Sequence, residues 1–130
     1  MPVIMRLVEG SARIEGGKAR VGGAGIELPK EDVNVELVLS AVAACIARRV
    51  SEAAGSSRVE VYVSAYGDLD KVLEGKEEIE YLEVVVKGVC GDGGEEALRR
   101  GVEACPIYGL LKGYVRRLIA SCYDEEPKGR

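Results

Sequence analysis

The stretch "ELVLSAVAACIARRV", residues 36–50, is an almost uninterrupted apolar run that contains one cysteine, Cys45. Asp32 or Asn34 can cap a helix that begins near residue 35, and Gly55 supplies a stop signal after residue 54. Because apolar residues lie nearly all round this helix, we expect it to be buried at the centre of the fold. Its many small residues would let another backbone approach closely.

The segments on either side of the helix alternate in the manner of strands, with glycine-rich turns between them. Gly16-Gly17 is typical of a two-residue hairpin. We expect an α+β fold with a mainly antiparallel sheet and the helices on one face, as one domain over residues 1–123 with a frayed tail at 124–130. The predicted strands are 3–9, 11–15, 18–21, 25–28, 58–66, 79–89 and 114–123, and the further helical segments are 91–104 and 106–113.

The composition limits the classes of function. The chain has 130 residues, a net charge of −4 and interspersed charges, which argue against a nucleic-acid surface. Its apolar runs are too short to span a membrane, and its start does not resemble a signal peptide, so we expect a cytoplasmic protein without membrane contact. The near absence of side-chain amides, with abundant Glu, Arg and Val, suggests a thermophilic source.

The chain contains no histidine. This excludes Ser-His-Asp and Cys-His catalysis and histidine metal sites. The four cysteines also lack the usual zinc-ligand spacings, which argues against a zinc centre. Any catalysis must therefore use Cys, Glu, Asp, Arg, Lys, Tyr or Ser.

Two cysteines are candidates for reactive thiols. Cys45 is either a small buried apolar side chain or a thiol activated by Arg48 and Arg49, which follow it by three and four residues on the same helix face. Cys105 precedes Pro106 and can cap the turn that follows, so that free backbone N–H groups would point at its sulfur and favour the thiolate. Alternatively, the Cys-Pro pair simply breaks the helix.

Cys90 and Cys122 lie at the ends of two predicted strands. They are either core residues or a disulfide that holds the C-terminal strand in place. Both interpretations give this pair a structural role.

The segments "VELVLSAVAAC" (35–45) and "ALRRGVEACPIYGLLKG" (97–113) together resemble the OsmC/Ohr superfamily of osmotically inducible and organic-hydroperoxide-resistance proteins. In that family one cysteine lies on a buried helix and a second precedes a proline at the end of another long helix. The likeness covers about residues 1–121.

The resemblance implies an intertwined homodimer with two long helices at its centre and an active site at the subunit interface. It implies a thiol-dependent peroxidase for organic hydroperoxides, in which Cys45 forms a sulfenic acid and Cys105 resolves it to a disulfide. A dithiol reductant, of lipoyl or thioredoxin-like type, would restore the thiols, and no metal or bound cofactor would be needed.

The family's reactive thiolate is held by an arginine and a glutamate that lies ten residues before the cysteine. Here that position is Val35, and Glu36 is one residue nearer. Either Glu36 serves after local adjustment, or the chain belongs to a divergent branch. Arg13 and Arg20 are the candidates for the arginine, and Arg20 is nearer the start of the helix. A non-catalytic module of the same fold that binds a small molecule or a partner is the alternative function, and a structural dimer stabilised by its cysteines is a third.

Overall fold

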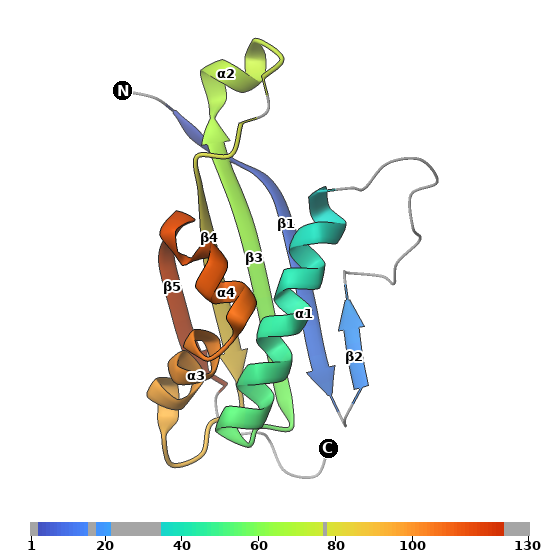
Figure 1. Cartoon of the computed structure of the whole chain (residues 1–130), viewed down its shortest axis with the longest axis vertical. Helices are drawn as coiled ribbons and strands as arrows, with labels where there is room; N and C mark the ends of the chain where they lie inside the picture. The colour runs from blue at the N-terminus through green and yellow to red at the C-terminus, as the bar shows by residue number, and fades with distance from the viewer. Residues whose placement is uncertain (1–2, 16–17, 22–34, 77, 124–130) are drawn as a thin grey trace.

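The computed structural model describes residues 3–15, 18–21, 35–76 and 78–123. Within this part of the chain, helices lie on one side of a five-stranded sheet (Figure 1). The strands are β1 (Ile4–Glu15), β2 (Lys18–Val21), β3 (Arg58–Asp68), β4 (Tyr81–Gly88) and β5 (Val115–Cys122), and the helices are α1 (Val35–Ala54), α2 (Leu69–Leu73), α3 (Gly94–Glu103) and α4 (Pro106–Leu111), followed by the 3₁₀ turn Lys112–Tyr114.

The sheet has the strand order β2-β1-β3-β4-β5. All neighbours are antiparallel except β4 and β5, which are parallel because α3 and α4 carry the chain back across the sheet between them. The structure therefore confirms an α+β fold with a mostly antiparallel sheet. The parallel pair at the edge makes the sheet a mixed one.

The first strand differs from its prediction. Segments 3–9 and 11–15 form one continuous strand, because Gly10 pairs with Val63 in the β1–β3 ladder and does not turn the chain. The pairing of Glu15 with Lys18 leaves two residues between β1 and β2, as the hairpin prediction requires. The predicted strand 25–28 and the two candidate caps of α1 lie outside the described residues.

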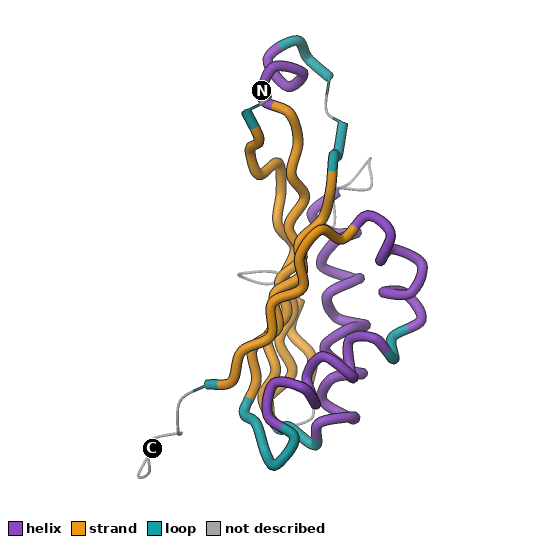
Figure 2. Tube along the Cα trace, turned by 90° about the vertical axis from the view of Figure 1, so that its left-hand side faces the viewer, coloured by secondary structure: helices purple, strands orange, loops and turns teal. Residues whose placement is uncertain are grey.

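The sheet has one apolar and one polar face. Figure 2 shows α1, α3 and α4 on the same side of the strands. Val59, Val61 and Val63 of β3 are at most 1% exposed and form the core with these helices. The alternate residues of β3 carry arginine, glutamate, tyrosine and serine to the other face, as a strand's two-residue period requires.

Helix α1 has the predicted bounds, and Gly55 follows it with φ +64°, a left-handed conformation that suits glycine. Its burial is one-sided. Leu39, Ser40, Ala43, Ile46, Ala47 and Val50 are buried, whereas Val35 and Val38 are 48% and 46% exposed. The expectation of a helix enclosed on all sides is therefore wrong for the single chain, since the sheet and α3 cover only part of its surface.

The expected second long helix is also wrong. Helix α3 has ten residues, and the chain turns at Cys105 before α4 begins at Pro106. Cys105 is extended, with φ −78° and ψ 121°, which is the conformation that a following proline favours. Gly93 caps α3, and Glu95 and Glu96 lie in its first turn, where their charge suits the helix dipole.

The charged segment between β3 and β4, for which no helix was predicted, contains the short helix α2. Asp68 caps it by accepting a hydrogen bond from the N–H of Asp70 at 2.9 Å. The described residues contain no helix that is long and apolar enough to cross a membrane.

Candidate active site

Cys45 lies on the exposed side of α1 and is a free thiol. The neighbouring Ile46 is fully buried, because each step along a helix turns the side chain by about 100°. Arg48 and Arg49 follow on the exposed surface, as the spacing predicted. Arg48 Nε lies 3.7 Å from Glu52 Oε2, in a solvent-exposed pair that stabilises the helix weakly. Of the two interpretations of Cys45, the accessible thiol fits the structure.

Cys105 has the opposite environment. It is the N-cap residue of α4, as predicted, but it is only 1% exposed and makes no side-chain capping hydrogen bond. Its backbone N–H donates to the Val102 carbonyl at 3.1 Å, and its carbonyl accepts from the Gly109 N–H at 3.0 Å. The expected hydrogen bonds from N–H groups to the sulfur are therefore absent, and the thiol lies in the apolar core.

Cys45 and Cys105 are not bonded to each other. One thiol faces solvent on α1, and the other is enclosed where α3 meets α4. Both helices pack against α1, so the two cysteines belong to neighbouring elements. A disulfide between them requires Cα atoms within about 7 Å and two sulfurs that face each other. In the described structure one thiol is exposed and the other is 1% exposed.

Glu36 lies in the first turn of α1 and is exposed. Nine residues separate it from Cys45, which places the two about 13.5 Å apart along the helix axis. This distance exceeds the combined reach of the two side chains. Within one chain, Glu36 therefore does not contact the thiol.

The two arginine candidates lie opposite each other. Arg20 is in β2, in register with Arg13 of β1, and its side chain is outside the described part of the structure. Arg13 Nε lies 3.2 Å from Glu60 Oε2, on the sheet face that α1 does not cover. Arg13 is thus engaged away from Cys45. Strand β2 packs beside α1, and the role predicted for Arg20 stays a prediction.

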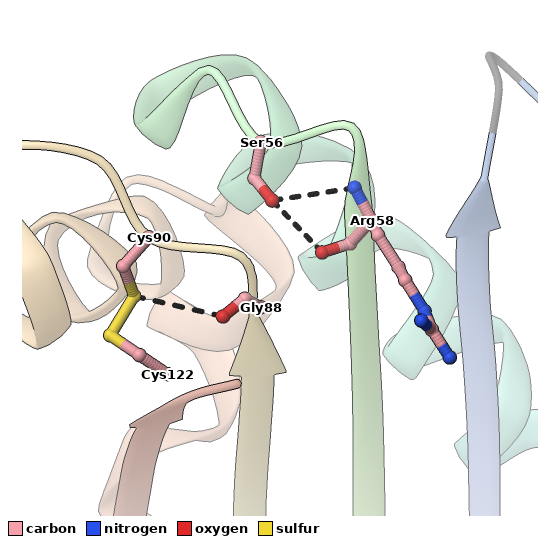
Figure 3. The surroundings of a disulfide bond; sticks show 5 residues. All are labelled: Ser56, Arg58, Gly88, Cys90 and Cys122. Carbon is pink, nitrogen blue, oxygen red and sulfur yellow. Dashed lines mark hydrogen bonds between the residues drawn. A yellow bond between two sulfur atoms is a disulfide. The ribbon is translucent and has the colours of Figure 1, made fainter. Parts of the chain in front are cut away.

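Cys90 and Cys122 form a disulfide with a Cα–Cα distance of 5.5 Å (Figure 3). This decides between the two interpretations of the pair. The bond joins the segment after β4 to the last residue of β5. Cys90 Sγ also lies 3.7 Å from the Gly88 carbonyl oxygen, a contact rather than a true hydrogen bond because a disulfide sulfur carries no hydrogen.

The chain end beside the disulfide is held by two more contacts. The Tyr123 N–H donates to the Gly88 carbonyl at 2.9 Å, and the Arg58 guanidinium lies 4.9 Å from the centre of the Tyr123 ring. Ser56 Oγ accepts from the Arg58 N–H at 3.3 Å and donates to the Arg58 carbonyl at 2.9 Å, which fixes the start of β3 (Figure 3). The ends of β3, β4 and β5 are thereby tied together.

The polar face of the sheet carries a cluster of charged and tyrosine side chains around Glu60, which was not predicted from the sequence. The Glu60 carboxylate lies near Arg13 and Arg58 and accepts a hydrogen bond from the Tyr62 hydroxyl at 2.9 Å. Burial opposes its ionisation, but the tyrosines Tyr123 and Tyr62 and the two arginines outweigh this effect and lower the Glu60 pKa. The signal was available: in "RVEVYVSAY" (58–66) each alternate residue is polar or tyrosine.

Tyr123 contributes to this cluster without a well-aligned hydrogen bond from its buried hydroxyl to a described residue. Burial and the nearby Glu60 carboxylate together raise the Tyr123 pKa far above its usual range. Farther along the same face, the rings of Tyr66 and Tyr81 stack at 5.1 Å, and Arg116 lies 4.5 Å from the centre of the Tyr81 ring. Apart from the Tyr123 hydroxyl, these side chains have charged, polar or aromatic partners within the cluster, and we interpret the cluster as structural.

No group of three or more Cys, Asp or Glu residues in the described ranges is arranged to hold a metal ion. Comparison with known proteins found no matching family model, no matching curated protein and no matching solved structure.

Proposed function

We propose that this protein is a thiol-dependent peroxidase of the OsmC/Ohr type, which reduces organic hydroperoxides through Cys45. The observation that carries the proposal is the free, exposed thiol of Cys45 on a long helix, with Arg48 and Arg49 on the same exposed surface. An accessible cysteine can react as a nucleophile in its thiolate form. The Cys105-Pro106 pair at the start of α4 supplies the second thiol.

In the proposed reaction the Cys45 thiolate attacks the terminal oxygen of a hydroperoxide ROOH. The O–O bond breaks, the alkoxide leaves as the alcohol ROH after taking a proton, and the sulfur becomes a sulfenic acid. The Cys105 thiol then attacks that sulfur, and a disulfide and water form. A dithiol of lipoyl or thioredoxin-like type reduces the disulfide and is itself oxidised to a disulfide.

We also propose that the protein acts as a homodimer in the cytoplasm. Val38, Ala41 and Cys45 follow each other at helical spacing on the exposed side of α1, and Leu110 and Tyr114 are 77% and 65% exposed beside α4. A second copy packed on α1 would cover this apolar surface and enclose Cys45 at the interface. It could also bring a charged residue to Cys45 that its own chain does not.

Exposed apolar side chains at the end of the sheet near α2 also favour a dimer. There the strands project past the helical layer (Figure 1), and four apolar side chains are exposed: Val3, Ile4, Leu73 and Ile79. Exposed apolar patches are typical of a surface that another chain covers. An intertwined dimer would cover both.

The alternative is a binding module of the same fold without peroxidase activity. The burial of Cys105 favours it, because a resolving thiol must reach the sulfenic acid. In this version the surface around Cys45 binds a small molecule or a partner, and neither thiol is consumed. The two functions differ in whether peroxide drives oxidation of a dithiol.

The test measures consumption of dihydrolipoamide with cumene, tert-butyl or hydrogen peroxide by the wild type and by Cys45→Ser and Cys105→Ser. The peroxidase requires turnover that Cys45→Ser abolishes, and a trapped sulfenic acid on Cys45 in Cys105→Ser. No turnover with any peroxide, together with thiols that stay reduced, would favour the binding module. A sulfenic acid on Cys105 in Cys45→Ser, and none on Cys45 in Cys105→Ser, would reverse the roles.

A further inference from the structure

The disulfide encloses the segment that carries the buried thiol. Cys105 lies between Cys90 and Cys122, and this closed segment contains α3, α4 and β5. While the bond is intact, the last residue of β5 stays joined to the segment after β4, so the two ends of the enclosed segment cannot separate.

Cys105 lies in the hydrophobic core, to which both the enclosed segment and α1 contribute. The thiol belongs to a core cluster with Leu98, Val102 and Tyr108 of the same segment and Ala120 of β5. Strand β5 lies at the edge of the sheet and, among the described strands, pairs with β4. An edge strand with one neighbour separates more readily than a central strand once its covalent tie is broken.

The disulfide itself is open to attack. Cys90 and Cys122 are half-buried, whereas Cys105 is 1% exposed. A dithiol reductant can therefore meet the bond before it meets the buried thiol. After reduction, β5 keeps non-covalent contacts only: the ladder to β4, packing against α3 and the core, the Arg117–Glu83 ion pair, the Arg116–Tyr81 ring contact, and the Tyr123 contacts with Gly88 and Arg58.

We propose that the Cys90–Cys122 disulfide is a redox gate that controls whether the Cys105 thiol can react. A dithiol attacks one sulfur and forms a mixed disulfide, and its second thiol then displaces the protein sulfur. Two protein thiols and one oxidised dithiol result, so two electrons and two protons pass to the protein. The unlocked segment opens locally, and Cys105 meets solvent.

This inference concerns the accessibility of Cys105 and holds whether or not Cys45 reduces peroxides. If the protein is a peroxidase, the gate makes resolution depend on the reducing state of its surroundings. Under oxidising conditions Cys105 stays enclosed, and a Cys45 sulfenic acid waits for another thiol.

The experiment measures the rate at which iodoacetamide alkylates each cysteine, by peptide mass spectrometry of the full chain. We compare the disulfide-bonded wild type, the wild type reduced with tris(2-carboxyethyl)phosphine, and Cys90→Ser/Cys122→Ser. Cys45 is the internal control, since it lies outside the closed segment. Amide hydrogen exchange of β3 in each form reports whether the core stays folded.

We expect Cys105 alkylation to rise about tenfold or more in the reduced and doubly substituted forms, while Cys45 changes by less than about twofold and β3 keeps its protection. Equal Cys105 rates in all forms would overturn the gate. So would a loss of β3 protection that parallels the gain at Cys105, or a double variant that does not fold, because the bond would then hold the entire fold and not one segment.

Discussion

Gly101 of α3 faces the backbone of Val50 in α1 so closely that a Cβ atom at position 101 would lie 2.7 Å from the Val50 Cα. The backbones of α1 and α3 are therefore in close contact here, and a larger side chain at position 101 would push the two helices apart. This contact holds α3, and through it the Cys105 turn, against the helix that carries Cys45.

Gly101→Ala should destabilise the fold, because the added methyl group must push α3 off α1. Overpacking of this kind costs about 1–3 kcal/mol in the free energy of unfolding. Urea denaturation followed by circular dichroism measures the change. Gly109→Ala is the matched control, since a Cβ at that helical position meets nothing within 4 Å, and it should be neutral or slightly stabilising. Equal losses for both variants would refute the close-contact explanation.

Loss of the disulfide should lower stability substantially. The bond spans 32 residues, and a closed loop of this length restricts the unfolded chain by about 3–4 kcal/mol in the chain-entropy model. Cys90→Ser/Cys122→Ser should show this loss in urea denaturation of the oxidised protein. Adding a reductant should reproduce the loss in the wild type and leave the double variant unchanged. If reductant destabilised both proteins equally, its effect would not come from this bond.

The acid limb of the stability profile should depend on Glu60. Its pKa is lower in the folded state than the ordinary value of 4.5, so ionised Glu60 stabilises the fold at pH values above 4.5. That contribution disappears as the pH falls below 4.5 and through the folded-state pKa. Glu60→Gln should therefore lower stability by about 1–3 kcal/mol at pH 7 and much less at pH 3.

Urea denaturation at both pH values checks the Glu60 prediction. Glu74→Gln, at the exposed end of α2, provides the comparison and should change stability little at either pH. A Glu60→Gln loss of the same size at pH 3 and pH 7 would mean that the ionised carboxylate contributes nothing beyond its packing.

The proposed dimer predicts that Val38→Lys weakens self-association, because it places a charge on the exposed apolar side of α1. Size-exclusion chromatography with light scattering should show a dimer for the wild type and a shift to monomer for the variant. Ala53→Lys is the control, since it adds the same charge to an exposed position in the last turn of the same helix. A monomeric wild type, or dissociation by both variants, would count against this interface.

Local patterns predicted most of the secondary structure correctly. The bounds of α1 follow from its apolar run and Gly55, and the turn at Cys105 follows from Pro106, because these signals act through the backbone within a few residues. The same local patterns did not predict the solvent exposure of Cys45 and Cys105. They placed Cys45 in an enclosed helix and predicted that backbone N–H groups point at the Cys105 sulfur, whereas the structure exposes Cys45 and gives Cys105 no side-chain capping hydrogen bond.

The sequence by itself determined where most of the described helices and strands lie, that any catalysis must do without histidine, and which cysteines deserved attention. The tertiary structure decided that Cys45 faces out, that Cys105 is enclosed and that Cys90 bonds to Cys122. The reason is physical. The burial of a cysteine depends on which side of its helix the sheet covers. A disulfide depends on whether two Cα atoms that are 32 residues apart in the sequence come within 5.5 Å of each other. The residues next to a cysteine determine neither its burial nor its disulfide partner.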